Sequence, residues 1–230
     1  MYGLFYAGKI PTLAQHEVNP GLPKSDRLNY IYFTLPVCIN FQRSSPAMWK
    51  SALETFNDSE TNYLFYPEKL AETNIEKIRT DLIKHKLGLQ PNKHTEIWTR
   101  ISSTLHKYFD NDPRKILQSK NFDVVEILKM LQETDKDKFP YLRGNKLSNY
   151  WLYILSQYTD IKLKNMHKIS IIPDTHVLQS TFKLGLTDKL ESPEIVIEVW
   201  QELLTGHKIT PVQMHPVLWN WSRNNFLPEV

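Results

Sequence analysis

The strongest constraint on the fold is an apolar stripe with helical spacing between residues 147 and 158. Large apolar side chains occupy positions i, i+3, i+4, i+7, i+8 and i+11, namely Leu147, Tyr150, Trp151, Ile154, Leu155 and Tyr158. Such a stripe covers one face of a helix for about three turns and is typical of a helix packed against a core. It excludes a β-strand here, because neighbouring residues of a strand point to opposite faces.

The same kind of signal recurs along most of the chain. Further helices are expected over residues 29–41, 46–56, 75–86, 93–109 and 122–131, from Asp174 to Gly185, and after each of the pairs Ser192-Pro193 and Thr210-Pro211. The stripe within residues 93–109 consists of Ile97, Ile101, Leu105 and Tyr108. Only residues 169–172 form a short, strand-like apolar link. About ten helices and no convincing sheet predict an all-α fold.

Composition narrows the class of protein. The chain has 230 residues, enough for one large domain or two small lobes. Its 41% hydrophobic and 12% aromatic residues indicate an ordered globular protein. No apolar run approaches the roughly 20 residues of a membrane span, and residues 1–9 lack the basic region of a signal peptide. We therefore expect an intracellular protein with no membrane partner.

Cys38 is the only cysteine. One thiol excludes an internal disulfide, a cysteine-rich zinc site and a protein-bound iron–sulfur cluster. Its neighbours Leu35, Val37 and Ile39 are apolar, so we expect an inert buried thiol. The eight histidines show no metal-binding spacing. We expect neither a metal site nor a cofactor.

The segment Phe139-Pro-Tyr-Leu-Arg-Gly-Asn-Lys146 leads directly into the strongest helix. Gly144 would let the chain turn tightly and expose backbone N–H groups, which suit a phosphate together with the helix N-terminus. Arg143 and Asn145 add polar side chains. The alternative is a plain turn between packed helices. The formal net charge of +3 is compatible with a nucleic-acid partner but does not require one.

Lys146 lies in the first turn of that helix, where the helix dipole disfavours a cation. Partial burial against Tyr150 or Trp151 would favour the uncharged amine further. A neutral amine is what attack on a sugar C1′ and Schiff-base formation require. The alternatives are a lysine that contacts a DNA phosphate and a lysine that faces water.

Asp174 is expected to cap the helix that follows it, and this structural role needs no chemistry. A carboxylate held in place at a cap can also stabilise an oxocarbenium-like sugar and can orient a water or an amine. Lys146 and Asp174 each stand at a helix start, 28 residues apart (174 − 146). One helix, a loop and an extended return would allow the two helix starts to lie side by side.

These segments together resemble the helix-hairpin-helix superfamily of DNA glycosylases, which includes endonuclease III, the adenine glycosylase and the oxoguanine glycosylases. Gly144-Asn-Lys146 resembles the hairpin whose lysine is catalytic in bifunctional members, and Asp174-Thr-His176 resembles the segment with the shared catalytic carboxylate. The run from Leu35 to Ala47 resembles the segment in which a glutamine, here Gln42, fills the space left by a flipped base. Leu87-Gly88-Leu89 followed by Lys93 resembles a further landmark.

The resemblance implies a two-lobed helical fold and a set of roles. Residues 30–158 would form a helical barrel carrying the helix-hairpin-helix, and residues 1–29 with 159–230 a second subdomain carrying the catalytic Asp174. Lys146 and Asp174 would be catalytic. The residues expected to contact DNA are Gln42, Arg143, Gly144, Asn145 and Thr175. The candidates for a base pocket are Phe139, His215 and Trp219.

Three aromatic residues and one histidine carry further predictions. Phe139 is a candidate to stack on a flipped base. Trp219 and Trp221 are two residues apart in an expected helix, so they cannot both face the core and one would line a pocket. His176 is expected to pack or hydrogen-bond behind Asp174.

The chain departs from the family pattern in three ways. Leu142 replaces the first hairpin glycine, the gap from Lys146 to Asp174 is longer than in endonuclease III, and the iron–sulfur cysteines are absent. These departures resemble the archaeal oxoguanine glycosylase branch. The function implied is that of a monomeric, base-excision DNA glycosylase with β-lyase activity on double-stranded DNA carrying a damaged base such as 8-oxoguanine. The alternatives are a monofunctional glycosylase, in which Asp174 activates water, and a non-catalytic DNA-binding module.

Overall fold

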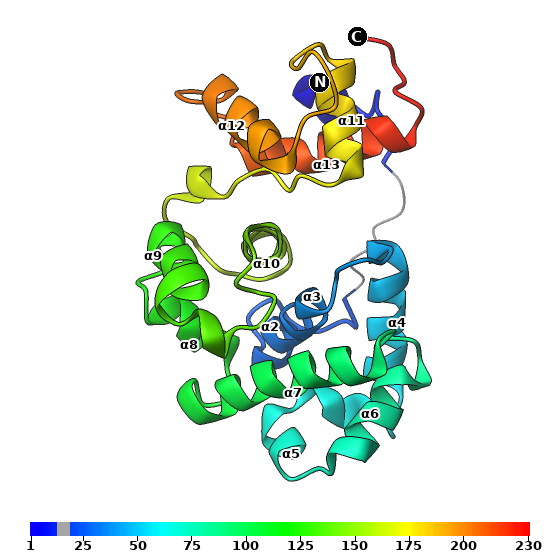
Figure 1. Ribbon diagram of the computed structural model, residues 1–230, viewed down its shortest axis with the longest axis vertical. Helices are drawn as coiled ribbons and strands as arrows, with labels where there is room; N and C mark the ends of the chain where they lie inside the picture. The colour runs from blue at the N-terminus through cyan, green and yellow to red at the C-terminus, as the bar shows by residue number, and fades with distance from the viewer. Residues whose placement is uncertain (13–18) are drawn as a thin grey trace. The chain divides into compact units, whose positions relative to one another are not determined.

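The computed structural model describes residues 1–12 and 19–230, and every regular element in these ranges is a helix (Figure 1). A single isolated bridge joins Asp123 to Lys164, and no strand is formed within the described ranges. The prediction of an all-α fold is confirmed. None of the helices in these ranges combines the length and the apolarity needed to cross a membrane.

The chain divides into two compact units. One is the central unit, His16–Lys164, and the other is the terminal unit, which joins Met1–Gln15 to Asn165–Val230. Each is described separately below.

The central unit contains nine of the labelled α-helices in its described part. They are α2 (Arg27–Tyr32), α3 (Leu35–Cys38), α4 (Ser45–Asn57), α5 (Pro67–Ala71), α6 (Ile75–Lys84), α7 (Pro91–Tyr108), α8 (Pro113–Gln118), α9 (Val124–Lys129) and α10 (Asn145–Tyr158). Short 3₁₀ or π turns add Asn62–Phe65, Met130–Thr134 and Lys136–Lys138. The long helix α7 packs against α5 and α6 on one side and α3 on another (Figure 1).

The expectation of one helix over residues 29–41 is wrong, although its burial is confirmed. The chain forms α2 and α3 instead, and α3 carries Pro36 at its second position. Proline lacks the N–H that a continuous helix would need there and its ring clashes with the preceding turn, so α2 must end before it. Almost every side chain from Tyr30 to Asn40 is nevertheless buried.

Helix α10 is held in the core of the central unit by its predicted stripe. Two of its aromatic side chains make buried hydrogen bonds: Trp151 Nε1 donates to Thr34 Oγ1 at 2.9 Å, and Tyr150 OH accepts from Trp49 Nε1 at 3.1 Å. Tyr158 stacks on Phe33 with ring centroids 4.9 Å apart. These contacts fix the helix whose first turn carries Lys146.

The stripe predicted for residues 93–109 is confirmed except at its end. Ile97, Ile101 and Leu105 are buried in α7, but Tyr108 is 60% exposed. Tyr108 is the last residue of the helix, and its ring lies 4.9 Å from the Lys138 ammonium rather than in the core.

The terminal unit is built around the pair α11 (Thr175–Lys183) and α13 (Pro211–Arg223) (Figure 1). Helices α1 (Tyr2–Tyr6) and α12 (Pro193–Leu203) pack against this pair. Its buried core includes Ile10, Ile171, Val177, Val196, Trp200, Val217, Leu218 and Trp221. Trp200 Nε1 donates to Thr181 Oγ1 at 2.9 Å, which joins α12 to α11. The link 169–172 is largely buried but pairs with no strand in the described ranges.

The capping predictions in the terminal unit are confirmed at Asp174 and Thr210, whereas Ser192 stands at the N-cap position of α12 without a side-chain cap bond. Asp174 Oδ1 accepts from the Val177 amide at 2.9 Å, and Thr210 forms a reciprocal capping box with Gln213. Gly185 and Gly206 follow α11 and α12 with positive φ angles of 69° and 79°, which glycine adopts without steric cost. The cap bond of Asp174 and the turn at Gly185 mark the two ends of α11.

Candidate nucleic-acid interface

The segment before α10 forms a tight turn, but Gly144 is not its left-handed residue. Tyr141 takes φ +64°, and the Leu142 amide donates to Pro140 O at 2.8 Å across it. Gly144 instead takes φ −75°, which any residue can adopt, and serves as the N-cap of α10. A Cβ at Gly144 would lie 3.3 Å from Tyr141 O, a tight contact that the turn would have to relax by a few tenths of an ångström to accept. The expected reason for the glycine is therefore corrected.

The N-terminus of α10 remains open. Gly144 has no side chain to cap it, and the helix has no side-chain cap bond. The side chains of Arg143, Asn145 and Lys146 are all exposed. Amides at such a helix start are suitable donors for an anion.

Lys146 is exposed, so the expectation of partial burial against Tyr150 or Trp151 is wrong. Those two aromatic residues face the core, whereas Lys146 precedes the first buried residue of the stripe, Leu147. The position of Lys146 on the helix thus places its amine in solvent. An exposed amine is accessible to a substrate.

The Gln42 segment lies against the hairpin. The rings of Phe41 and Tyr141 stack with centroids 4.4 Å apart and an interplanar angle of 13°. The Lys93 ammonium lies 5.0 Å from the centroid of each ring. Gln42 itself is exposed and has φ +52°. Two segments that were singled out separately in the sequence therefore form one surface of the central unit.

Sequence reasoning missed the residues that join these segments. Phe41 and Tyr141 were not candidates, and Lys93 was noted only as part of a family landmark. A stack between residues so far apart in the chain leaves no periodic signal. The one local signal is Pro91 at the start of α7, which indicates that Lys93 lies in the first turn of that helix.

Asp174 belongs to the terminal unit, where it is half-buried and its Oδ1 makes the cap bond described above. Thr175, which follows it, is exposed. His176 lies in the first turn of α11, and its Nδ1 is 3.0 Å from Ser222 Oγ. Burial lowers the pKa of His176, although the nearby Asp174 carboxylate acts in the opposite direction. The expectation that His176 packs and hydrogen-bonds is confirmed.

The base-pocket candidates have different environments. Trp219 is half-buried, whereas Trp221 is buried in the core. The Trp219 ring meets His176 edge-on at 5.6 Å, and the Arg223 guanidinium lies 5.4 Å from it. His215 is also half-buried. The expected difference between the two tryptophans is confirmed.

Phe139 is fully buried in the central unit, and its ring packs 6.2 Å from that of Phe109. A ring with no exposed face cannot stack on a base in this conformation. Phe139 is therefore a core residue here, and the preceding residue is bonded to α7 through Thr104 Oγ1, which donates to Lys138 O at 2.8 Å.

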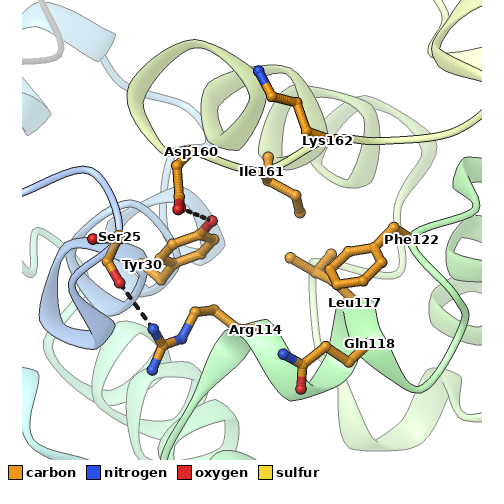
Figure 2. A pocket seen from close by; sticks show the side chains of 9 residues that line it. All are labelled: Ser25, Tyr30, Arg114, Leu117, Gln118, Phe122, Asp160, Ile161 and Lys162. Atoms are coloured by element: carbon orange, nitrogen blue, oxygen red, sulfur yellow. Dashed lines mark hydrogen bonds between the residues drawn. The ribbon is translucent and has the colours of Figure 1, made fainter.

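A separate hollow of about 380 Å³ lies in the central unit beyond the C-terminal end of α10 (Figure 2). Tyr30 OH donates to Asp160 Oδ1 at 2.7 Å on one side, and Arg114 Nη1 donates to Ser25 O at 2.8 Å below it. The remaining lining residues are Leu117, Gln118, Phe122, Ile161 and Lys162. None of the residues predicted for the site lines this hollow.

The described residues contain no group of three or more side chains arranged to hold a metal ion. Cys38 is completely buried, and burial raises the pKa of its thiol to about 12. The prediction of an inert thiol agrees with this environment.

No family model matches the chain, and no curated protein sequence matches it.

Proposed function

We propose that this protein is a base-excision DNA glycosylase with β-lyase activity, acting as an intracellular monomer on double-stranded DNA with a damaged base. The observation that carries the proposal is the surface formed by Phe41, Tyr141 and Lys93, which joins the Gln42 segment to the hairpin and to the exposed start of α10. Cations and open helix amides suit the phosphate backbone.

In the proposed reaction, the damaged nucleotide leaves the duplex stack, at a cost of a few kcal/mol that is smallest for damaged pairs. Gln42 is exposed on a fixed turn and would occupy the space left behind. Arg143, Asn145 and the open amides following Gly144 would hold the nearby phosphate. Thr175 is exposed beside Asp174 and would add a further contact.

Lys146 Nζ would attack C1′ in its neutral form. The C1′–N bond breaks, and the base leaves with the electron pair and takes up a proton. The lysine nitrogen then expels O4′, which takes up a proton as the sugar ring opens, and a Schiff base forms between Nζ and C1′. This Schiff base lowers the barrier to loss of the C2′ proton to a general base. The C3′–O bond then breaks and the 3′ phosphate departs. This sequence needs no cofactor or iron–sulfur cluster.

Asp174 would stabilise positive charge on the sugar and accept the proton that Lys146 must lose before attack. Its cap bond uses Oδ1 and orients the carboxylate. Lys146 belongs to the central unit and Asp174 to the terminal unit. We infer 8-oxoguanine as the first base to test, from the family resemblance alone. In the same way, residues 30–158 would act as the barrel with the helix-hairpin-helix, and residues 1–29 with 159–230 as the lobe with the catalytic Asp.

A second candidate is a monofunctional glycosylase in which Asp174 activates water and Lys146 only contacts phosphate. The exposure of Lys146 favours it, because a lysine side chain that extends into solvent is free to contact a phosphate. Half-buried Trp219 and His215 would contribute to the base pocket in either mechanism.

Borohydride trapping on labelled duplexes with 8-oxoguanine, an oxidised pyrimidine, uracil or an abasic site tests the proposal. The full chain should form a covalent adduct that Lys146→Gln abolishes. Lys162→Gln is the matched control, because Lys162 is also an exposed lysine of the central unit but lies at the separate hollow.

Base release without an adduct would support the monofunctional mechanism instead. If no base is released from any duplex but DNA is still bound, the protein would be a non-catalytic DNA-binding module. Strand cleavage that survives Lys146→Gln would overturn the role of Lys146.

A further inference from the structure

Arg43 ties the Gln42 segment to the turn at residues 86–89. Its Nη1 donates to Leu87 O at 2.6 Å, and its Nη2 donates to Lys86 O at 3.1 Å. Burial lowers the pKa of Arg43 to about 10, which leaves the guanidinium charged at neutral pH. Lys86 has φ +59° and Gln42 has φ +52°, so a non-glycine residue is held in the left-handed region on each side of this tie. Such conformations persist where surrounding contacts fix them.

His94 makes a second tie to the same turn. Its side chain is 1% exposed, and its Nδ1 accepts the Leu89 amide at 3.1 Å. Burial, together with the Arg43 and Lys93 cations, lowers the pKa of His94 to about 4. The neutral ring must therefore carry its proton on Nε2, because Nδ1 is the acceptor.

That Nε2–H is buried and has no hydrogen-bond partner among the described residues. A buried donor without a partner lowers stability, because it has lost its hydrogen bonds to water. An apolar side chain of similar size would avoid this cost but could not accept the Leu89 amide. His94 thus makes two contacts that an apolar residue could not both make. Its ring lies edge-on to the Phe41 ring, with centroids 5.1 Å apart, and its Nδ1 accepts the Leu89 amide.

The two ties act on neighbouring parts of the proposed DNA surface. Phe41 is followed directly by Gln42 and Arg43, so fixing Arg43 also fixes the backbone that presents Gln42. Gln90 Nε2 lies 3.4 Å from Gln42 Oε1 on the outer side. A segment ordered in advance does not lose that conformational freedom on binding.

We propose that Arg43 and His94 are positioning residues. They hold the Gln42 segment and the Lys86–Leu89 turn in one preformed arrangement, which fits a DNA duplex that lacks one base in its stack. The inference rests on the proposed function. Neither side chain needs to touch DNA: Arg43 bonds to backbone carbonyls, and His94 is buried. Substitution of either residue should therefore weaken binding only to duplexes that contain a space for the Gln42 side chain.

The test compares binding of the full chain to two duplexes of one sequence, intact and with a single abasic site. Arg43→Lys keeps the charge but cannot span two carbonyls, and His94→Leu removes the acceptor. Each should weaken binding to the abasic duplex about 10-fold while changing binding to the intact duplex less than about twofold, a difference near 1.4 kcal/mol. His94→Asn places an oxygen near the position of Nδ1 and should restore most of the preference.

His106→Asn is the matched control, because this histidine is on the same helix but is exposed and bonds to Asn111 instead. Circular dichroism establishes whether each variant folds. If His94→Leu does not fold, Arg43→Lys alone tests the inference. Unchanged preference in Arg43→Lys, or an equal loss for both duplexes, would overturn the inference. If the unsubstituted chain shows no preference for the abasic duplex, the proposed function fails as well.

Discussion

The rings of Phe41 and Tyr141 lie nearly parallel, 13° apart, with their centroids separated by 4.4 Å. Tyr141 belongs to the turn before α10, and Phe41 precedes the exposed Gln42. The stack is therefore the contact through which two candidate DNA-binding segments become one surface. Lys93 lies at 5.0 Å from both centroids and gives that surface a cation.

Lys93→Gln should weaken binding of duplex DNA in a way that does not depend on sequence. If the ammonium contacts one phosphate, the slope of log K against log salt should decrease in magnitude by about 1. Fluorescence anisotropy over a series of salt concentrations measures this slope. Lys162→Gln, a change of equal charge at the separate hollow, should leave the slope unchanged. Equal slopes for all three proteins would place Lys93 outside the interface.

Substitution of Asp174 should separate its capping role from its proposed chemistry. Asn caps a helix about as well as Asp, so Asp174→Asn should leave the free energy of unfolding nearly unchanged, whereas Asp174→Ala should lower it by about 1 kcal/mol. Both should abolish base release if the carboxylate is catalytic. Urea unfolding and a single-turnover assay provide the two readouts. Normal base release by Asp174→Asn would reduce Asp174 to a cap.

Acidification should destabilise the protein through His94. Its folded-state pKa is lowered from 6.5 to about 4, so between these pH values the unfolded chain binds the proton and the folded chain does not. Stability therefore falls as pH decreases from 6.5 to 4, by up to about 3 kcal/mol from this group, and is unaffected by it above 6.5. Urea unfolding across this range should give a flatter profile for His94→Asn. Parallel profiles would show that His94 is not buried in its neutral form.

The hydrogen bond between Trp151 and Thr34 should contribute measurably to stability. Thr34→Val keeps the shape but leaves the buried indole N–H without its acceptor, which should lower the free energy of unfolding by about 2 kcal/mol. Thr99→Val is the control, because its partly buried hydroxyl bonds only to carbonyls of its own helix. Urea denaturation provides the comparison. Similar losses in both variants would assign the effect to the hydroxyl group itself.

The features that the sequence predicted well are local ones. The stripe from Leu147 to Leu155 and the cap at Asp174 depend on spacing within one or two turns, and both are present. The break between α2 and α3 was missed because the apolar run outweighed Pro36, although a proline at that point is incompatible with a continuous helix. The approximate limits of α4, α6, α7, α12 and α13 follow from the same short-range rules, whereas the short helices α1, α5 and α8 were not predicted.

The features that were missed depend on contacts between distant segments. Lys146 was expected to be partly buried, but the face of α10 that meets the core begins at Leu147. The burial of Phe139 depends on how the hairpin folds back. No spacing rule relates Phe41 to Tyr141, or Arg43 to the carbonyl of Leu87, because chain folding rather than periodicity creates those pairs.

The left-handed conformation of Tyr141 has a consequence for the autonomy of the hairpin. A side chain at φ +64° costs about 1–2 kcal/mol relative to the usual regions, and glycine would adopt it freely. The Cβ of Tyr141 creates this cost, and the ring of the same side chain stacks on Phe41, so the turn is stable only while its distant partner is in place. An excised peptide covering residues 136–158 should keep helical character in α10 yet lose the turn. The shape that would meet DNA is thus a property of the assembled central unit, and transplanting residues 139–146 alone into another protein would not carry it along.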